Sequence, residues 1–320
     1  MIFANRIARG LWWERAWSLV EGCSPMSPGC DHCWSAAQAH MRAHQSNPKM
    51  QQRYAGVNHP DGRWNGHIKL LEKNLLLPHE TNRPTVWAVW NDLFHENVPD
   101  DFIDSAFSIM AIANWHHFII LTKRYERLAQ YFSAPDYDFW GDRWARNPIE
   151  PEPTVFPLPN VSIGITAENQ EWWDIRKETF LNIPAAHRVV SCEPLLGPIH
   201  FTREELARID QIIVGGESGP GARPMHPDCP RKIRDDCEAA GVAFFFKQWG
   251  NWGIDERGIG DDPDPLGRTA MAYRDGEVDV NWEPGARCRG AITMSRMKKK
   301  RAGRLLDGRE HNDLIWAPAA

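Results

Sequence analysis

Six short apolar segments between residues 85 and 246 constrain the fold of this chain more than any other feature. Segments with helical periodicity lie between them, and this alternation is typical of parallel βα units. Continuous apolar runs indicate strands that are buried on both faces. The pattern therefore predicts an α/β fold, a full or partial (β/α) TIM-like barrel with a C-terminal extension. The six segments are residues 85–90, 117–121, 160–165, 188–190, 211–214 and 242–246.

A polar cluster follows each of these segments. The carboxyl ends of parallel strands meet at one edge of a sheet, and that edge carries the active site of barrels and of doubly wound sheets. The amide, hydroxyl and carboxylate groups there suit a ligand with an amine, a ribose and an adenine, although strand-to-helix turns and structural ion pairs are equally consistent with them. The candidate ligand-binding residues are Asn91, Asp92, Thr122, Thr166, Glu168, Asn169, Ser191, Glu193, Gly215, Gly216, Glu217, Ser218 and Lys247.

A loop over residues 22–34 gathers three of the seven cysteines before the first of these units. Cys23, Cys30 and Cys33 have the spacing C-x6-C-x2-C, and Gly and Pro interrupt the loop between them. Three thiolates suit an iron–sulfur cluster that leaves one iron open to a small molecule, since such clusters are normally held by four cysteines. A zinc site with His32 as the fourth ligand is an alternative, and so is a disulfide with one remaining thiol. The spacing alone leaves all three open.

Composition sets the class of protein. At 320 residues the chain can form one barrel-sized domain or two ordinary ones. A net charge of −5 argues against a generally basic nucleic-acid binder. No apolar run approaches membrane-spanning length, and residues 1–6 lack the apolar core of a signal peptide. We expect a cytoplasmic monomer whose thiols stay reduced, with no membrane partner.

The expected organisation has two parts. Residues 1–252 form the barrel, with the cysteine loop at 22–34 and an insertion at 134–159, and residues 253–320 form the extension. The extension contains a basic run at 287–304, which is either a solvated face or a contact for nucleic-acid phosphates. Cys192 is expected to be core packing, and Cys229, Cys237 and Cys288 have no assigned role. Further candidates for nucleic-acid contacts are Trp140, Trp144, Trp249, Trp252, Arg223, Arg231, Lys232 and Arg234.

A resemblance to a known family runs from about residue 20 to residue 316. It is carried in order by GCSPMSPGCDHCW, WNDLFHENVPDDFI, HHFIILTKRYERL, NVSIGITAENQE, RVVSCEPLLGPI, IIVGGESGPGARPMH, FFFKQWGNWG and LLDGREHNDLIW. In these segments the chain resembles the phage-type three-cysteine-motif family of proteins of unknown function, which is similar to an outlying branch of the radical S-adenosylmethionine (SAM) enzymes. The spacing C-x6-C-x2-C is that of this family, and it departs from the C-x3-C-x2-C that is usual among radical SAM enzymes.

The resemblance implies that Cys23, Cys30 and Cys33 ligate a [4Fe–4S] cluster whose open iron binds SAM. Reduction by a donor such as flavodoxin or ferredoxin would then yield a 5′-deoxyadenosyl radical. By analogy, the expected substrate is a hypermodified thymine in phage DNA, which the enzyme would rearrange or otherwise modify. The alternatives are a radical SAM enzyme acting on a protein or small molecule, and a zinc- or cluster-stabilised DNA-binding protein without catalysis.

Overall fold

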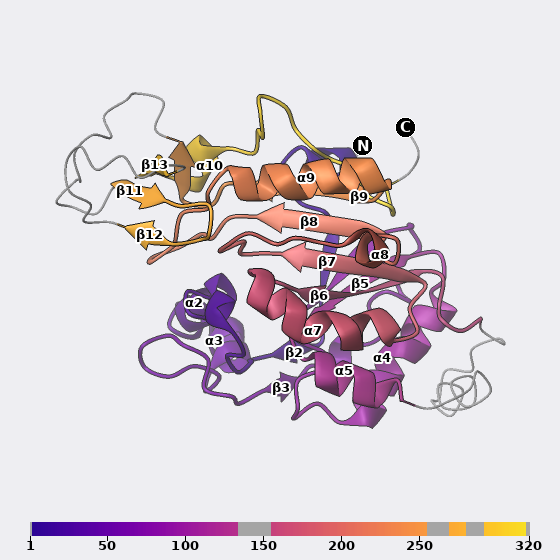
Figure 1. Ribbon diagram of the computed structural model, residues 1–320. Helices are drawn as coiled ribbons and strands as arrows, with labels where there is room; N and C mark the ends of the chain where they lie inside the picture. Colours follow the sequence, from indigo (N-terminus) through magenta and orange to yellow (C-terminus); the bar gives the residue numbers. More distant parts are fainter. Residues whose placement is uncertain (1, 134–154, 255–268, 280–290, 318–320) are drawn as a thin grey trace.

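The computed structural model describes residues 2–133, 155–254, 269–279 and 291–317. Within these residues, seven parallel strands form a curled sheet in the order β1-β4-β5-β6-β7-β8-β9, with helices against its outer face (Figure 1). The sheet stays open between β1 and β9 and so resembles half of a barrel. This confirms the coarse prediction of a mixed α/β fold with a partial β/α barrel.

All six predicted strands are present, each followed by its carboxyl-edge loop. The strands of the sheet are β1 (Arg15–Ser18), β4 (Val86–Trp90), β5 (His117–Thr122), β6 (Val161–Thr166), β7 (His187–Cys192), β8 (Gln211–Gly215) and β9 (Ala243–Gln248). The helices between them are α4 (Asp100–Ile112), α5 (Tyr125–Tyr131), α7 (Gln170–Asn182), α8 (Arg203–Leu206) and α9 (Asp228–Ala240).

The N-terminal segment contributes the edge strand that the apolar pattern did not reveal. Helix α1 (Ile2–Ile7) precedes β1, which pairs in parallel with β4 so that Ser18 lies beside Trp90. Only Trp17 of the four residues of β1 is buried. Such a short strand carries no apolar run, so its pairing depends on the neighbouring β4 rather than on its own composition.

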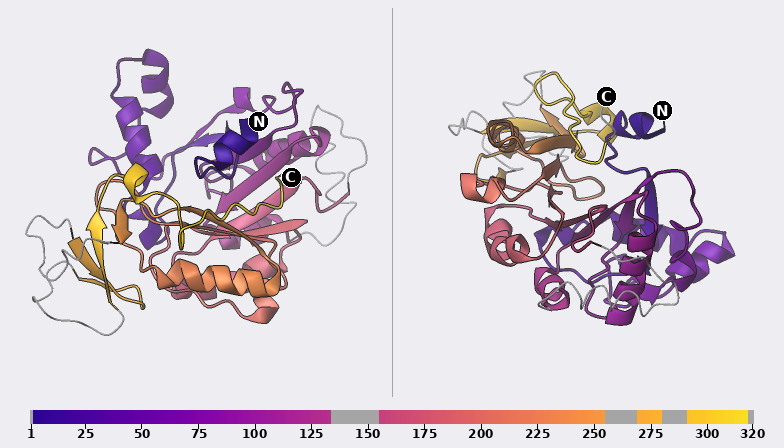
Figure 2. Two further views of the ribbon diagram at one scale, coloured as in Figure 1. Left: turned by 90° about the horizontal axis from the view of Figure 1, so that it is seen from above. Right: turned by 90° about the vertical axis from the view of Figure 1, so that its right-hand side faces the viewer.

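Two apolar cores lie on opposite faces of the sheet, because successive side chains of a strand point to opposite sides. Phe118 and Ile120 of β5 pack into the outer core under the helices, whereas Ile119 packs into a smaller concave core. Phe3 of α1 and Trp316 near the C-terminus belong to this concave core. Helix α1 and the C-terminal segment as far as Ala317 therefore fill the concave face, where they lie side by side (Figure 2).

The C-terminal segment also covers the edge of β9. The backbone N–H of Phe246 donates to the His311 carbonyl at 3.0 Å, and that of Asp313 donates to the Phe244 carbonyl at 3.2 Å. The Trp316 indole donates to the carbonyl of Trp12 at 2.7 Å. Covering an edge in this way satisfies backbone groups that would otherwise be open to pairing with another chain.

Two smaller units complete the described chain. Strand β2 (Val20–Glu21) pairs with β3 (Lys69–Leu70), and between them lie the short helices η1 (Pro28–Cys30), α2 (Trp34–Ala43) and α3 (Pro48–Tyr54); the short helix η2 (Glu72–Asn74) follows β3. A second sheet has the order β10-β13-β11-β12, with helix α10 (Lys299–Ala302) after its last strand in sequence. Its strands are β10 (Trp252–Ile254), β11 (Thr269–Ala272), β12 (Val278–Asp279) and β13 (Ile292–Arg296).

Several sequence-based predictions fall on other parts of the chain. Most of the insertion at 134–159, with Trp140 and Trp144, lies outside the described residues, as do Arg287, Cys288 and Arg289 of the basic run. Within the part of the chain that the structure describes, no helix combines the length and the hydrophobicity needed to cross a bilayer.

Candidate functional site at the carboxyl edge of the sheet

The cysteine loop lies at the carboxyl edge of the sheet, where α2 and α3 extend beyond the strand ends (Figure 1). Cys30 ends η1 and Cys33 precedes α2, and both thiols are free, as is that of Cys23. Burial raises the pKa of Cys23 to about 12 and also raises that of Cys33. Cys30 is close enough to contribute to both increases. The three thiols are thus near neighbours beside the strand ends.

A buried ion-pair cluster anchors the middle of the loop to β6. The Ser27 hydroxyl donates to the carboxylate of Glu168 at 2.5 Å, and Lys123 contacts the same oxygen. Arg176 of α7 reaches the other carboxylate oxygen at 3.0 Å, and neither Arg176 nor Glu168 is exposed. Burial opposes ionisation of Glu168, but Lys123 and Arg176 outweigh it and keep its pKa below the usual value. The carboxylate is therefore ionised and joins the loop to two elements.

A second anchor holds the loop at Ser24. Arg124, which follows β5, donates to the Ser24 carbonyl at 3.1 Å and pairs with Glu96 at 2.5 Å. The Nδ1 of His95 accepts from the Asn97 backbone at 3.2 Å, so its proton lies on Nε2, which donates to Ser24 Oγ at 2.9 Å. Burial and then Arg124 lower the pKa of His95 to about 4. Because Nε2 of His95 carries the proton, it cannot accept a proton from the Ser24 hydroxyl. His95 therefore positions Ser24 and does not activate it as a nucleophile.

A third anchor connects the loop to the segment after β8. Arg223 makes a two-pronged contact with Glu217, at 2.6 and 2.9 Å, and donates to the Pro28 carbonyl at 2.8 Å. His32 Nδ1 is 3.2 Å from Glu217, and a Cβ at Gly221 would be 2.7 Å from His32 Nε2. Glu217 thus holds Nδ1 of His32, and the absence of a side chain at Gly221 leaves room for the ring beside the loop.

The loop carries the three thiols that a metal cluster would need, but in this structure they are not close enough together to hold one. Within the described ranges, no three side chains of His, Cys, Asp and Glu are close enough together to hold a metal ion. The three adjacent thiols nevertheless suit iron in their chemistry, and the Met26 backbone N–H already donates to Cys30 Sγ at 3.5 Å. Loading would deprotonate the thiols and draw them closer together.

Five of the predicted ligand-binding residues line the concave face at the ends of neighbouring strands. Thr166 pairs in register with Ser191, and Ser191 donates to Glu193 at 3.2 Å. Lys247 pairs with Glu193 at 2.7 Å, and a Cβ at Gly215 would lie 2.8 Å from that carboxylate. Within the described residues the buried Thr166 Oγ1 has no hydrogen-bond partner. This arrangement offers a hydroxyl, a carboxylate and an ammonium group to one ligand.

Lys299, which belongs to the basic run, lies close to Glu193 and Lys247. The pKa of Lys299 in α10 is lowered mainly by desolvation and, to a smaller extent, by the positive charge of Lys247. The negative charge of Glu193 acts in the opposite direction. Lys299 therefore lies near the Glu193–Lys247 pair. Its exposed neighbours Lys298, Lys300 and Arg301 extend toward solvent.

Other predicted site residues have structural contacts. Asp92 accepts from Thr122 at 2.7 Å and from the Phe94 backbone at 3.0 Å, and burial raises its pKa. Asn91 bonds to the Val20 carbonyl at 2.7 Å and accepts from Ser35 at 3.0 Å. Asn169 caps α7, Gly216 packs against the Trp249 backbone, Ser218 is half-buried, and Glu168 and Glu217 anchor the loop.

The residues near β8 and β9 that were predicted to contact nucleic acid have other contacts within the described chain. Trp249 and Trp252 are 6% and 3% exposed, and both indoles donate to backbone carbonyls, so neither presents a face for stacking. The four nearby cations are already in ion pairs with carboxylates of this chain, which weakens them as phosphate contacts. These cations are Arg223, Arg231, Lys232 and Arg234.

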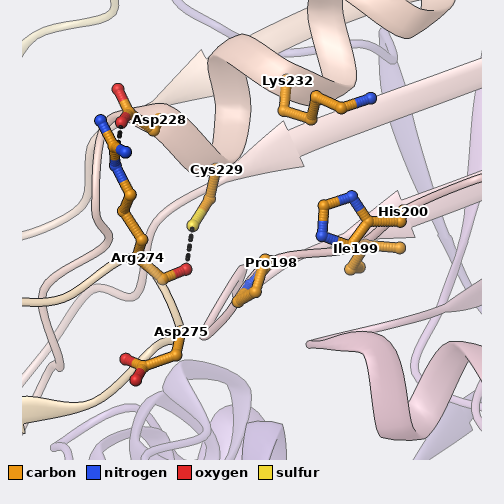
Figure 3. A pocket seen from close by; sticks show the side chains of 8 residues that line it. All are labelled: Pro198, Ile199, His200, Asp228, Cys229, Lys232, Arg274 and Asp275. Atoms are coloured by element: carbon orange, nitrogen blue, oxygen red, sulfur yellow. Dashed lines mark hydrogen bonds and ion pairs between the residues drawn. The ribbon is translucent and has the colours of Figure 1, made fainter. Parts of the chain in front are cut away.

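A cavity of about 460 Å³ lies between α9, the segment after β7 and the turn after β11 (Figure 3). Arg274 on its wall pairs with Asp228 at 2.7 Å, and the buried Cys229 packs with Sγ 3.8 Å from the Arg274 carbonyl. None of the predicted ligand-binding residues lines this cavity. Cys192 is buried in the outer core, as expected for a packing residue, and Cys237 is buried in the same core.

Sequence reasoning missed the side chains that hold the loop. Arg124 and His95 lie in segments whose role only the fold reveals, and Arg176 lies within α7 with no apolar or acidic pattern to mark it. A usable signal exists for Arg124, because it directly follows Thr122 and Lys123 at a strand end.

Fold and site together define a class: a half-barrel α/β protein with a three-cysteine loop anchored at the carboxyl edge. The family model described as "Protein of unknown function (DUF5131)" matches residues 8–315, and the chain belongs to that family. Searches of curated proteins and of solved structures gave no match.

Proposed function

We propose that the protein is a radical SAM enzyme that uses a [4Fe–4S] cluster held by Cys23, Cys30 and Cys33. The observation that carries the proposal is the placement of three adjacent free thiols at the carboxyl edge of a curled parallel sheet. Ligands of such folds bind at that edge. Three separate anchors fix the loop there, which supports a role for its position as well as for its cysteines.

The cofactors would supply the difficult chemistry, since a reduced cluster with bound SAM yields a 5′-deoxyadenosyl radical. The chain's own residues bind and orient the ligand. Glu193 can accept hydrogen bonds from an amine or ribose, and Lys247 can pair with a carboxylate. Thr166 Oγ1 is free to bond to a ligand atom, because no group of the described chain uses it. Gly215 leaves the space beside Glu193 that a side chain would fill.

The substrate that we propose is a base of DNA, in particular a hypermodified thymine that the enzyme rearranges. This part of the proposal rests on the resemblance to phage-type three-cysteine proteins. The exposed cations Lys298, Lys300 and Arg301 beside Lys299 support it, because they can contact phosphates near the proposed site.

Metal analysis of protein purified without oxygen tests this proposal. About four irons with matching sulfide per chain, and a visible charge-transfer absorption, are expected. A Cys30→Ala variant should lose both, whereas a Cys229→Ala variant, altered in the wall of the cavity beside α9, should retain them. A colourless protein that holds one zinc would contradict the proposal.

A further inference from the structure

The lobe formed by residues 34–71 differs in charge from the rest of the molecule. It contains five Lys and Arg residues, four histidines and a single carboxylate, Asp61, in a chain with net charge −5. Asp61 pairs with Arg63 at 2.7 Å, and Arg53 pairs with Glu21 outside the lobe. Within the described residues the other cations have no carboxylate partner. These are Arg42, Lys49 and Lys69.

A row of tryptophans begins on this lobe. Trp34, at the start of α2, is 46% exposed and meets Trp90 edge-to-face, with ring centroids 5.1 Å apart. Trp90 meets Trp13 in the same way at 5.8 Å, and the Arg6 guanidinium lies 5.2 Å from the Trp13 ring. Trp34 directly follows Cys33, so the exposed end of the row adjoins the cysteine loop.

The other end of the row lies at the concave face. Val86 and Ala88 of β4 belong to the concave core, and alternation along the strand puts Trp90 on the same face. The Ser35 hydroxyl donates to Asn91 at 3.0 Å and so ties α2 to the end of β4. The row therefore connects the exposed lobe with the face that carries Thr166 and Glu193.

We infer that this basic lobe binds an unpaired stretch of nucleic acid, with phosphates on Arg42, Lys49 and Lys69 and a base stacked on Trp34. Single-stranded nucleic acid is recognised by this combination of cations and an open aromatic face. A duplex would have to expose a base first, because paired bases present no face for stacking. As a substrate-binding role, the inference rests on the proposed function.

The lobe favours nucleic acid over other partners by its composition. Within its described residues, Trp34 and Met41 are the large hydrophobic side chains that are exposed, which is too little apolar surface for a membrane or a helix-binding groove. An acidic protein segment would pair with the cations but would gain no stacking from Trp34. Dependence on Trp34 therefore separates the two kinds of partner.

Fluorescence anisotropy with a labelled single-stranded 12-mer DNA and its duplex tests the inference on the full chain. The single strand is expected to bind tightly. Trp34→Ala should weaken binding roughly tenfold, whereas Trp34→Phe, which keeps an aromatic ring, should retain most of the affinity. Lys49→Ala should reduce the slope of log K against log salt by about 0.7. The matched controls are Trp115→Ala, which alters an exposed tryptophan before β5, and Lys232→Ala on α9, which removes an ammonium group already paired with Asp236.

The outcomes separate the lobe from other surfaces. Equal binding by wild type, Trp34→Ala and Lys49→Ala would overturn the inference, and so would a salt slope that depends on Lys232 but not on Lys49. Preference for an acidic peptide, independent of Trp34, would also overturn it. Binding is measured in the Cys30→Ala background as well as in wild type. The absence of an iron–sulfur cluster from the wild-type protein would refute the proposed function, whereas the binding result would stand on its own.

Discussion

Replacing Glu168 with glutamine should remove the main anchor of the cysteine loop and destabilise the protein strongly. The side chains of Glu168 and Arg176 are fully buried, with Arg176 Nη1 3.0 Å from the carboxylate. The change leaves the Arg176 charge buried and uncompensated, at a cost of about 3–5 kcal/mol. Lys123 is 18% exposed and can turn toward water, so it should add little. Against a usual total of about 5–15 kcal/mol, this is a large loss.

Urea unfolding followed by tryptophan fluorescence measures the loss in the ligand-free protein. A second readout is the rate at which a thiol reagent modifies the loop cysteines. Glu168→Gln should speed modification of Cys23, Cys30 and Cys33, because the Ser27 hydroxyl then loses the charged carboxylate to which it donates. The matched control is Glu171→Gln, which alters an exposed carboxylate at the start of α7 and should change stability by less than about 0.5 kcal/mol.

An unfolding free energy for Glu168→Gln within about 1 kcal/mol of wild type would refute this reasoning. It would mean that the Arg176 charge reaches solvent or another partner. Unchanged thiol reactivity alongside a large loss of stability would instead show that the ion-pair cluster supports the sheet and not the loop.

Three further predictions follow from the same contacts. Arg223→Ala should speed thiol modification of the loop more than Arg234→Ala, whose ion pairs lie elsewhere, and equal rates would argue against the third anchor. Gly164→Ala should lower the unfolding free energy by about 1–3 kcal/mol, since its Cβ would lie 2.5 Å from the Val189 carbonyl; unchanged urea stability would contradict the packing. Burial lowers the pKa of His117 to about 3. The unfolded chain thus binds the extra proton, and stability should fall from pH 6.5 toward pH 3 by up to about 1.4 kcal/mol per unit. His117→Gln should flatten that fall in urea titrations.

The sequence predicted the sheet well because its strands are buried on both faces. Runs such as residues 117–121 and 242–246 are apolar throughout, so no other element competes for them. The apolar pattern does not predict strand β1, because only Trp17 is buried in it. The carboxyl edge was also correct as a location for polar groups, since it follows from parallel pairing alone.

The two faces of the sheet could not be told apart from the sequence. Thr122 continues the outer face of Phe118 and Ile120 and bonds to Asp92, whereas Thr166 lies on the concave face. Both faces are apolar, so period two identifies which residues share a face but not which face is concave. The contribution of Arg176 depends on tertiary burial, which no local pattern marks.

The release of 5′-deoxyadenosine from SAM tests the central proposal most directly. Protein loaded with iron and sulfide, reduced with dithionite and incubated with SAM should form 5′-deoxyadenosine by liquid chromatography, and Cys229→Ala should do the same. Cys30→Ala should form none. Intact SAM in every sample that contains a loaded, folded protein would contradict the proposal that this three-cysteine loop supports radical chemistry.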